Sequence, residues 1–272
     1  MRGLNGQRII EAEEFVLRDS QGKARARLYM VDGEPELVFS SSSGKPQVVI
    51  GMSGDAPHIT LADNQGAVRV TIGVSPESAG MRVSNSCGKD TLMVGESQEA
   101  ASLIFESPKG DSKAAVVVNA SGSSFRVFDP AGNLAGTLEA KEKGPALHIR
   151  NPESQFSASL EMESSGPQLS FSDAKGTNRT VLGLDEEGGK LILSDSKGIT
   201  RAGLVADESA AGLVLNDSKG TAKAELQVTD EKPDLLFSHP NGNAALLIDA
   251  DESGPAITFF DEQGEQVEQI PE

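Results

Sequence analysis

The amino-acid sequence predicts an all-β protein of twelve tandem 22-residue β-hairpin repeats. Three observations lead to this fold class: a glycine every 22 residues, apolar residues at fixed distances from it, and an Asp-x-x-Gly turn between two alternating stretches. One skipped position holds Ser154, and the period continues through it. The recurring glycines are Gly22, Gly44, Gly66, Gly88, Gly110, Gly132, Gly176, Gly198, Gly220, Gly242 and Gly264.

The first stretch of each repeat is predicted to be a strand with one apolar face. Large apolar residues stand seven and five positions before the glycine in every repeat, from Phe15 and Leu17 to Ile257 and Phe259. This spacing of two is the side-chain period of a strand. Several of these residues are aromatic, and we expect them to pack in a core: Phe15, Phe39, Phe105, Phe171, Phe237 and Phe259.

The turn that follows opens with Asp in most repeats, as in Asp19 to Gly22, although Ser41 and Ser107 take this place twice. Asp accepts hydrogen bonds from the turn backbone, and Gly adopts positive φ without steric cost. Basic residues three positions after the glycine should lie across the turn from the acids and partly neutralise them. They are Arg25, Arg69, Lys113, Arg179, Arg201 and Lys223.

A second strand follows each glycine, with an apolar residue six positions after it, from Leu28 in the first repeat to Ile270 in the last. Asp, Gly and Pro then break the chain again, as in Gly144-Pro145. Each repeat is therefore two strands and two turns. We expect a lead over residues 1–12 and a single repeat domain over residues 13–272.

The hairpins are expected to close into a flower-like or propeller-like array, with a β-solenoid as the alternative. A solenoid would stack Asp173, Asp195 and Asp217 about 4.8 Å apart, which is unfavourable for like charges, whereas hairpins separate them. One round barrel of this many strands would be too wide for side chains to fill. A closed form would have to flatten, divide or pack as blades.

Composition excludes several classes of function. Lys and Arg number 24 against 41 Asp and Glu, a formal charge of −17, which argues against a protein that binds nucleic acid through phosphates. A single cysteine, Cys87, excludes an internal disulfide framework and a multi-thiolate metal site. We find neither a signal peptide nor a membrane span, and expect a cytoplasmic protein.

No catalytic motif is present. The nucleophile elbow, phosphate loop, dinucleotide fingerprint and zinc-protease motif are all missing. His58, His148 and His239 stand eight, six and three positions before the glycine position, so they share no row. Cys87 lies in a turn without an evident base. The Asp turns lack the spacing of a calcium loop. We therefore predict no catalytic, cofactor-binding or metal-binding residues.

Two segments carry a family resemblance, Leu17 to Leu28 and Leu193 to Leu204. They resemble uncharacterised bacterial hairpin-repeat proteins with an L-x-D-x-x-G-K-x-R-A-x-L unit, which are similar to the shallow barrels called β-flowers. The resemblance extends over nearly the whole chain from about Glu13. It implies a non-catalytic module, and the likeness of such barrels to tubby-type barrels implies an association with lipids.

Uniform repeats without catalytic motifs predict a non-enzymatic structural or protein-interaction scaffold. The expected partner is a protein or a second copy of the chain. The alternative is a membrane- or lipid-associated module, implied by the resemblance to tubby-like barrels. We expect no nucleic acid, no small-molecule substrate and no cofactor.

Overall fold

The computed structural model describes residues 10–142, 144–229, 232–251 and 254–271, and in these ranges the chain forms β-strands and turns without a helix. The chain falls into two compact units, unit 1 over Met1–Gly132 and unit 2 over Asn133–Glu272. The predicted lead lies outside the described residues except for positions 10–12, which precede the first strand.

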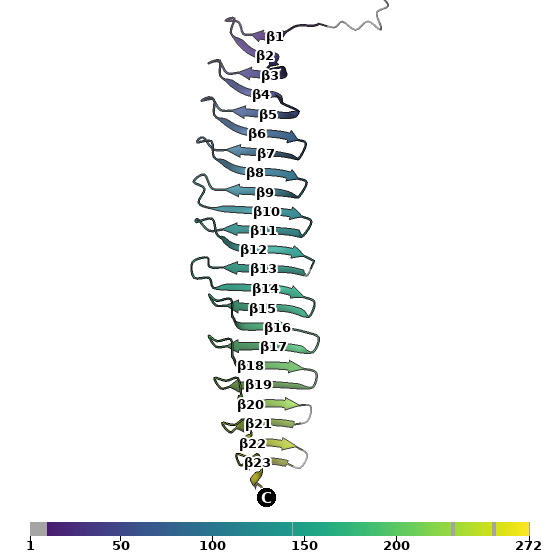
Figure 1. The fold of residues 1–272 in the computed structure, drawn as a ribbon, viewed down its shortest axis with the longest axis vertical. Helices are drawn as coiled ribbons and strands as arrows, with labels where there is room; N and C mark the ends of the chain where they lie inside the picture. Colours follow the sequence, from purple (N-terminus) through teal and green to yellow (C-terminus); the bar gives the residue numbers. More distant parts are fainter. Residues whose placement is uncertain (1–9, 143, 230–231, 252–253, 272) are drawn as a thin grey trace, which may run out of the picture. The chain divides into compact units, whose positions relative to one another are not determined.

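Unit 1 contains eleven strands in its described residues. They are β1 (Glu14–Arg18), β2 (Ala24–Val31), β3 (Glu34–Ser40), β4 (Pro46–Ser53), β5 (Ala56–Ala62), β6 (Val68–Ser75), β7 (Ser78–Ser84), β8 (Asp90–Ser97), β9 (Ala100–Glu106), β10 (Lys113–Asn119) and β11 (Gly122–Phe128). Each pairs antiparallel with the strands next to it in the sequence. Unit 1 is therefore a β-meander (Figure 1).

Unit 2 contains thirteen strands in the ranges that the structure describes. They are β12 (Leu134–Lys141), β13 (Gly144–Arg150), β14 (Ser157–Glu163), β15 (Gly166–Ser172), β16 (Asn178–Leu184), β17 (Gly188–Ser194), β18 (Thr200–Asp207), β19 (Ala210–Asn216), β20 (Ala222–Thr229), β21 (Lys232–Ser238), β22 (Ala244–Asp251), β23 (Gly254–Phe260) and β24 (Gln266–Ile270). Each again pairs antiparallel with its sequence neighbours.

The predicted closed array is wrong, and so is the solenoid. Within the described residues, β1 pairs only with β2 and β24 pairs only with β23, so each has an open outer edge. A ring leaves no strand with an open edge. A solenoid would stack equivalent strands parallel, whereas every pairing described in both units is antiparallel. The prediction of all-β hairpin repeats is confirmed.

The Asp-x-x-Gly turns have the predicted form. In the turn between β15 and β16, the backbone N–H of Gly176 donates to the carbonyl of Asp173 at 2.9 Å, and the N–H of Asp173 donates to the carbonyl of Thr177 at 3.0 Å. Gly176 has φ of +79°. These bonds define a type I turn followed by a glycine in the left-handed region, the usual three-residue hairpin loop. Next to this turn, a β-bulge shifts the pairing register of β15 and β16 between Phe171 and Ser172.

In most hairpins one residue of the second strand is left over in a bulge, but in two hairpins this residue lies in the loop. After Ser107 and after Asn151 the closing backbone bond spans one more residue, to Ser112 and to Phe156. Neither hairpin has a register shift in its strands. In the turn whose glycine position holds Ser154, the next residue, Gln155, adopts a positive φ of 62°. The residue that forms a bulge elsewhere lies in the loop here, so the 22-residue period is kept.

At the opposite end of the strands the connections are two-residue turns. Asp32 and Gly33, both with positive φ, join β2 to β3, and Gly54 with φ of 59° opens the turn from β4 to β5. Primed turns of these kinds match the twist of the strands that they join. In both units the described turns are therefore too short to carry one sheet layer over another.

We predict that Gly176→Ala lowers the free energy of unfolding by about 1–2 kcal/mol, because an L residue is strained in the left-handed region. A Cβ at Gly176 would meet no atom within 4 Å, so the backbone conformation alone carries the cost. Gly176→Asn is the matched control and should cost less, since Asn tolerates this region. Urea unfolding at one fixed protein concentration measures both. Equal losses for the two variants would contradict the prediction.

Candidate interaction surfaces

One face of the sheet in each unit carries the large apolar residues of the repeat, and we call it the apolar face. Its central row consists of the residues seven before and six after each glycine position, which pair directly across the strands. In unit 1 this row is Phe15, Leu28, Leu37, Ile50, Ile59, Ile72, Met81, Val94, Leu103, Val116 and Phe125. In unit 2 it is Leu138, Leu147, Leu160, Leu169, Leu182, Leu191, Leu204, Leu213, Leu226, Leu235, Ile248, Ile257 and Ile270.

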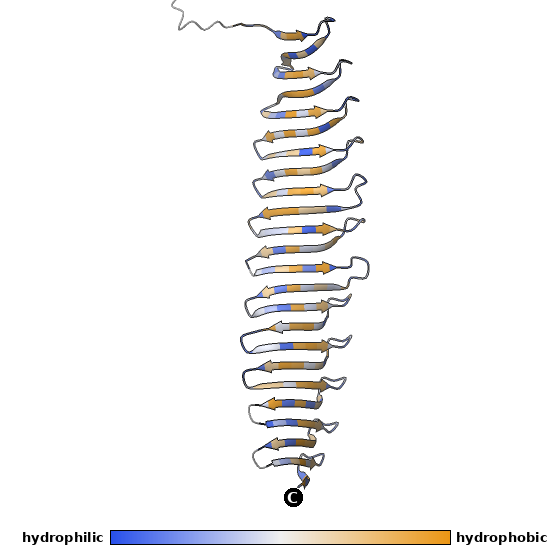
Figure 2. Cartoon of the chain, turned by 180° about the vertical axis from the view of Figure 1, so that it is seen from behind, coloured by the Kyte–Doolittle hydropathy of each residue, from blue (hydrophilic) through white to orange (hydrophobic). Residues whose placement is uncertain are grey.

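Two further rows flank the central row. The turn-side row lies nearer the Asp-x-x-Gly turns and begins Leu17, Ala26 and Phe39, and the far row begins with Met30 and Pro35. Among the paired, described positions of all three rows, only Glu96 and Glu268 are charged. Figure 2 shows hydrophobic residues recurring along the strands of both units.

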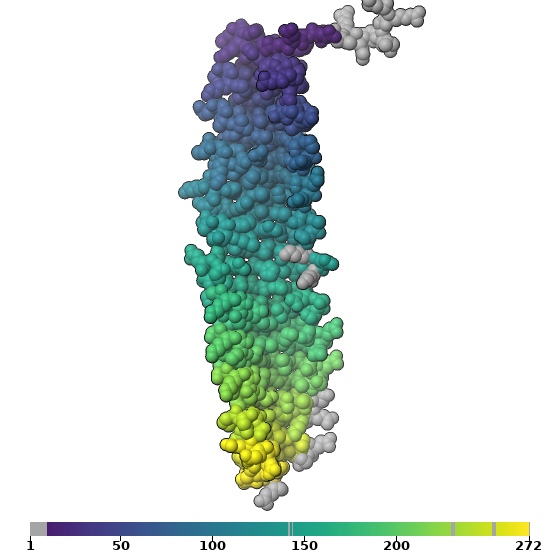
Figure 3. Space-filling view, in the orientation of Figure 1, coloured from purple at the N-terminus to yellow at the C-terminus, as the bar shows by residue number. Residues whose placement is uncertain are grey.

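The apolar face is exposed. Leu182, Leu204 and Leu226 each keep 51% of their surface accessible, and Phe171 keeps 47%. The phenylalanines expected in a core instead lie on this face, exposed between 37% and 50%. The expectation was wrong because a meander with short turns forms a single layer. In Figure 3 the colours of each unit follow one another in bands, as strands contact their sequence neighbours.

The opposite face, here the polar face, is the better covered one. The hydrophobic residues buried in the described chain, Val38 and Ala115, lie on it, as do buried Ser170 and Thr258. Long polar side chains lie over small residues there. The Glu36 side chain lies over Gly51 in unit 1, and the Lys190 side chain lies over Gly183 in unit 2. Lys190 also pairs with Asp185 at 2.9 Å.

The turn acids and bases form the predicted pairs and also join neighbouring repeats. Arg179 Nη1 lies 3.4 Å from Asp173 Oδ2, and Arg179 Nε donates to the carbonyl of Ser194 at 2.9 Å. Ser194 ends the first strand of the next repeat, so one guanidinium contacts two repeats. Equivalent acid–base pairs are Arg25–Asp19, Arg69–Asp63, Arg201–Asp195 and Lys223–Asp217, at 3.6, 3.5, 3.7 and 3.9 Å.

Lys113 departs from this pattern. Its turn begins with Ser107, which is not an acid, and Lys113 Nζ instead lies 5.6 Å from the centre of the Phe128 ring. The contact is of the cation–π type. The prediction for the basic position is therefore confirmed for the other five residues and wrong for Lys113.

The pKa is lowered for five turn aspartates: Asp19, Asp63, Asp173, Asp195 and Asp217. For Asp173 the largest cause is the hydrogen bond from the backbone N–H of Lys175, at 2.9 Å, and the N–H of Thr177 and the Arg179 guanidinium lower the pKa further against partial desolvation. The pKa of Asp217 is lowered first by the Lys219 N–H and then by the Thr221 N–H. These groups stabilise the carboxylate more than the acid.

The histidines and the cysteine occupy unrelated places. His58 lies on the polar face of β5, and His148 on that of β13, 3.7 Å from Glu139 and 3.9 Å from Glu161. His239 opens the turn after β21, and its Nε2 is 3.0 Å from the carbonyl of Phe260. Cys87 is exposed. In the described residues no group of three or more His, Cys, Asp or Glu is placed to bind a metal ion.

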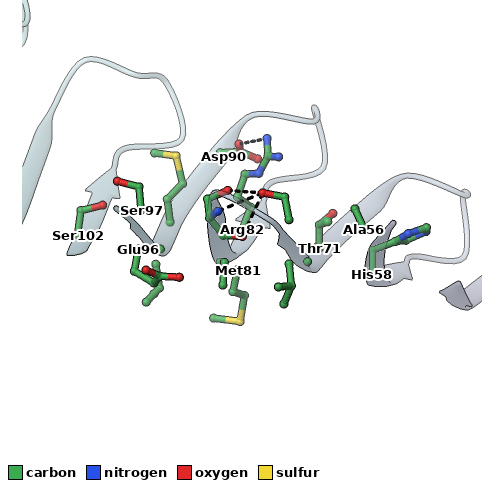
Figure 4. A pocket seen from close by; sticks show the side chains of 18 of the residues that line it. Ala56, His58, Thr71, Met81, Arg82, Asp90, Glu96, Ser97 and Ser102 are labelled. Atoms are coloured by element: carbon green, nitrogen blue, oxygen red, sulfur yellow. Dashed lines mark hydrogen bonds and ion pairs between the residues drawn. The ribbon is translucent and has the colours of Figure 1, made fainter. Parts of the chain in front are cut away.

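A hollow of about 710 Å³ lies over β4–β9 of unit 1 (Figure 4). Arg82 and Asp90 meet there at 3.8 Å, and Ser84 donates to Asp90 at 2.6 Å. His58 points away from this pair (Figure 4). The labelled side chains do not converge on one point, so the hollow offers a charged pair beside small residues rather than an acid, a base and a nucleophile in reach of one another.

No family model matches the chain, and no curated protein matches it. Among solved structures, similarity was found to a protein of unknown function from Bacteroides caccae, with TM-score 0.18, 9% identity and coverage of 81% of this chain and 87% of that one. A functionally unknown protein from Desulfotomaculum acetoxidans gives TM-score 0.17, 9% identity and coverage of 87% and 92%. The TcdB2-TccC3-Cdc42 structure gives TM-score 0.19, 10% identity and coverage of 93% and 19%. Scores this low carry no functional argument.

No helix in the described ranges has the length and apolar character needed to cross a membrane.

The lowered pKa values predict acid-sensitive stability. A carboxyl group whose pKa is lower in the folded chain contributes stability above its unfolded pKa, about 3.9, and loses it as the pH falls through the folded value. Asp173→Ala should lower the melting temperature at pH 7 more than Asp173→Asn, because Asn retains the turn bonds. Asn85 already makes the equivalent bonds, to the N–H groups of Cys87 and Lys89 at 2.9 and 3.0 Å.

The melting temperature of the wild type should approach that of Asp173→Asn as the pH falls from 7 towards 3, because the Asp173 carboxylate is then protonated and loses its charge, whereas Asn is uncharged at every pH. Thermal melts followed by circular dichroism test this, and the triple variant Asp173→Asn/Asp195→Asn/Asp217→Asn enlarges the effect. Curves that stay parallel over the whole pH range would show that the carboxylate charge contributes nothing.

Proposed function

We propose that the chain is a non-enzymatic structural scaffold that acts through contacts with other protein chains. The observation that carries the proposal is the repetition of the described hairpins: the same central row and the same neighbour pairing recur along both units, and most of the described hairpins share one type of turn. Catalysis needs groups of different chemistry that converge on one point. A repeated hairpin presents the same groups at regular intervals.

The edge of the sheet formed by the Asp-x-x-Gly turns, here called the turn edge, presents carboxylates to possible partners. Asp-x-x-Gly turns follow β1, β5, β11, β15, β17, β19 and β23; the three after β15, β17 and β19 come at consecutive repeats, which places successive turns about 9.6 Å apart in a β-sheet. Their carboxylates are held in place by backbone hydrogen bonds and, in five turns, by a basic side chain. Repeat proteins use such one-dimensional arrays as extended binding surfaces.

Affinity capture tests the scaffold role. Wild-type chain on a resin should retain a specific, saturable set of proteins at moderate salt, and an unrelated acidic protein of equal charge is the control. The triple variant Asp173→Asn/Asp195→Asn/Asp217→Asn should no longer retain proteins that bind the turn edge. Its circular dichroism spectrum should still be that of β-strands. Retention no greater than that of the acidic control would contradict the proposal.

A lipid-associated module is the second candidate, because the exposed apolar face would gain from contact with acyl chains. The resemblance to tubby-like barrels suggested the same role. Against it stands the formal charge of −17, which opposes approach to anionic membranes.

Vesicle flotation separates the two candidates. We expect the wild type to stay at the bottom of the gradient with both kinds of vesicle. Anionic vesicles repel its formal charge of −17, and zwitterionic vesicles carry no net charge that would attract it. Flotation with zwitterionic vesicles that is lost in a variant of the apolar face, Leu204→Glu, would favour the lipid module. The polar-face variant Val205→Glu is the control.

A further inference from the structure

We propose that the apolar face is covered by the apolar face of a second copy of this chain, so that the protein is a homo-oligomer built face to face. In each unit the described strands form one layer, and the central row on this face is largely half exposed. Soluble monomers rarely expose continuous apolar surface beyond a few hundred Å². A second β-layer about 10 Å away is the usual cover for such a face.

The exposed area is sufficient for a stable interface. The chain has 18536 Å² of accessible surface, whereas a folded monomer of its mass, 28.4 kDa, exposes about 11,000 Å². The excess of about 7,000 Å² is shared by both faces and the edges of the strands, and the part on the apolar face needs to reach only the roughly 800 Å² that each partner contributes to a standard interface. Large, mostly apolar interfaces are characteristic of obligate oligomers.

The turn-side row has the relief that an identical partner would complement. In unit 2, large residues alternate with small ones from strand to strand: Ile149, Ala158, Phe171, Thr180, Leu193, Ala202, Leu215, Ala224 and Phe237. A second copy displaced by one strand places each large side chain opposite a small one. Both copies repeat at the same interval, so the fit continues along the row.

Charge favours a second copy over a lipid surface. The three rows contain two charged positions, Glu96 and Glu268, among their paired, described residues, so two apolar faces can meet with little burial of charge. The formal charge of −17 is therefore carried mainly by the turns and the polar face, which remain in water when the apolar faces meet. Burial of unpaired charge is the usual obstacle to such contacts.

The matched variants are neighbours in β18. Leu204 is 51% exposed on the apolar face, and Val205 is 48% exposed on the polar face. We expect a light-scattering mass of at least twice 28.4 kDa for the wild type after size exclusion, and the same mass for Val205→Glu. Leu204→Glu combined with Leu226→Glu should dissociate to the monomer, with a dissociation constant raised at least ~100-fold.

Two further measurements keep the proposal testable if the double variant fails to fold. Leu204→Ala adds no charge and should raise the dissociation constant about tenfold, measured by dilution. The melting temperature of the wild type should rise with protein concentration, as it does for oligomers, and that of Leu204→Ala should rise from a lower value. Circular dichroism confirms that each variant keeps its strands.

The proposal is overturned if the wild type is monomeric at micromolar concentration, if the double variant Leu204→Glu/Leu226→Glu keeps the wild-type mass, or if Val205→Glu dissociates to the same extent as that double variant. A wild type that is monomeric alone and floats with zwitterionic vesicles would show that lipid covers this face. The inference stands apart from the scaffold role: a chain that self-associates yet captures no partner contradicts that role alone, and a monomer that captures partners contradicts this inference alone.

Discussion

The structure depends on cross-strand register. In each unit a large apolar residue of one strand pairs directly with that of the next, so the central row continues without a gap along the described strands. Side chains alternate between faces along a strand, and a slip of one residue would move the whole row to the other face. The 22-residue period, with its bulge or its longer loop, keeps the row in place in every described hairpin.

A single layer held in this way is stabilised locally. Backbone ladders and cross-strand pairs act between neighbouring strands, and the basic side chains of the turns extend this coupling to the next repeat, as Arg179 does with Ser194. What the layer lacks is burial. Globular domains gain most of their stability from burying apolar surface between layers. The polar face is partly covered by its own side chains, whereas the large side chains of the apolar face stay exposed.

Local features of the fold could be predicted from the sequence, and global ones could not. Strands, turns and the Arg179–Asp173 type of pair follow from residues within one repeat, and the structure confirms them. Closure depends on which sheet edges meet, and no repeat specifies that. The repeated apolar positions indicate an apolar face but not what packs against it. The sequence therefore predicts Phe171 in a core, whereas the structure leaves it exposed. The short turns were the overlooked signal, because they leave no connection long enough to fold one layer over another.

The turns after Ser107 and Asn151 have a consequence for how such a chain can change in length. There the extra residue lies in the loop and not in a strand bulge, and the apolar residues of the two strands still pair directly. Insertion or deletion of a single residue within a strand, by contrast, would move the apolar residues that follow it in that strand to the other face. Duplication or deletion of one whole repeat leaves every remaining side chain on its face. The number of residues in such a chain can therefore change in steps of one 22-residue repeat, by recombination between repeats, without any substitution in the repeats that remain.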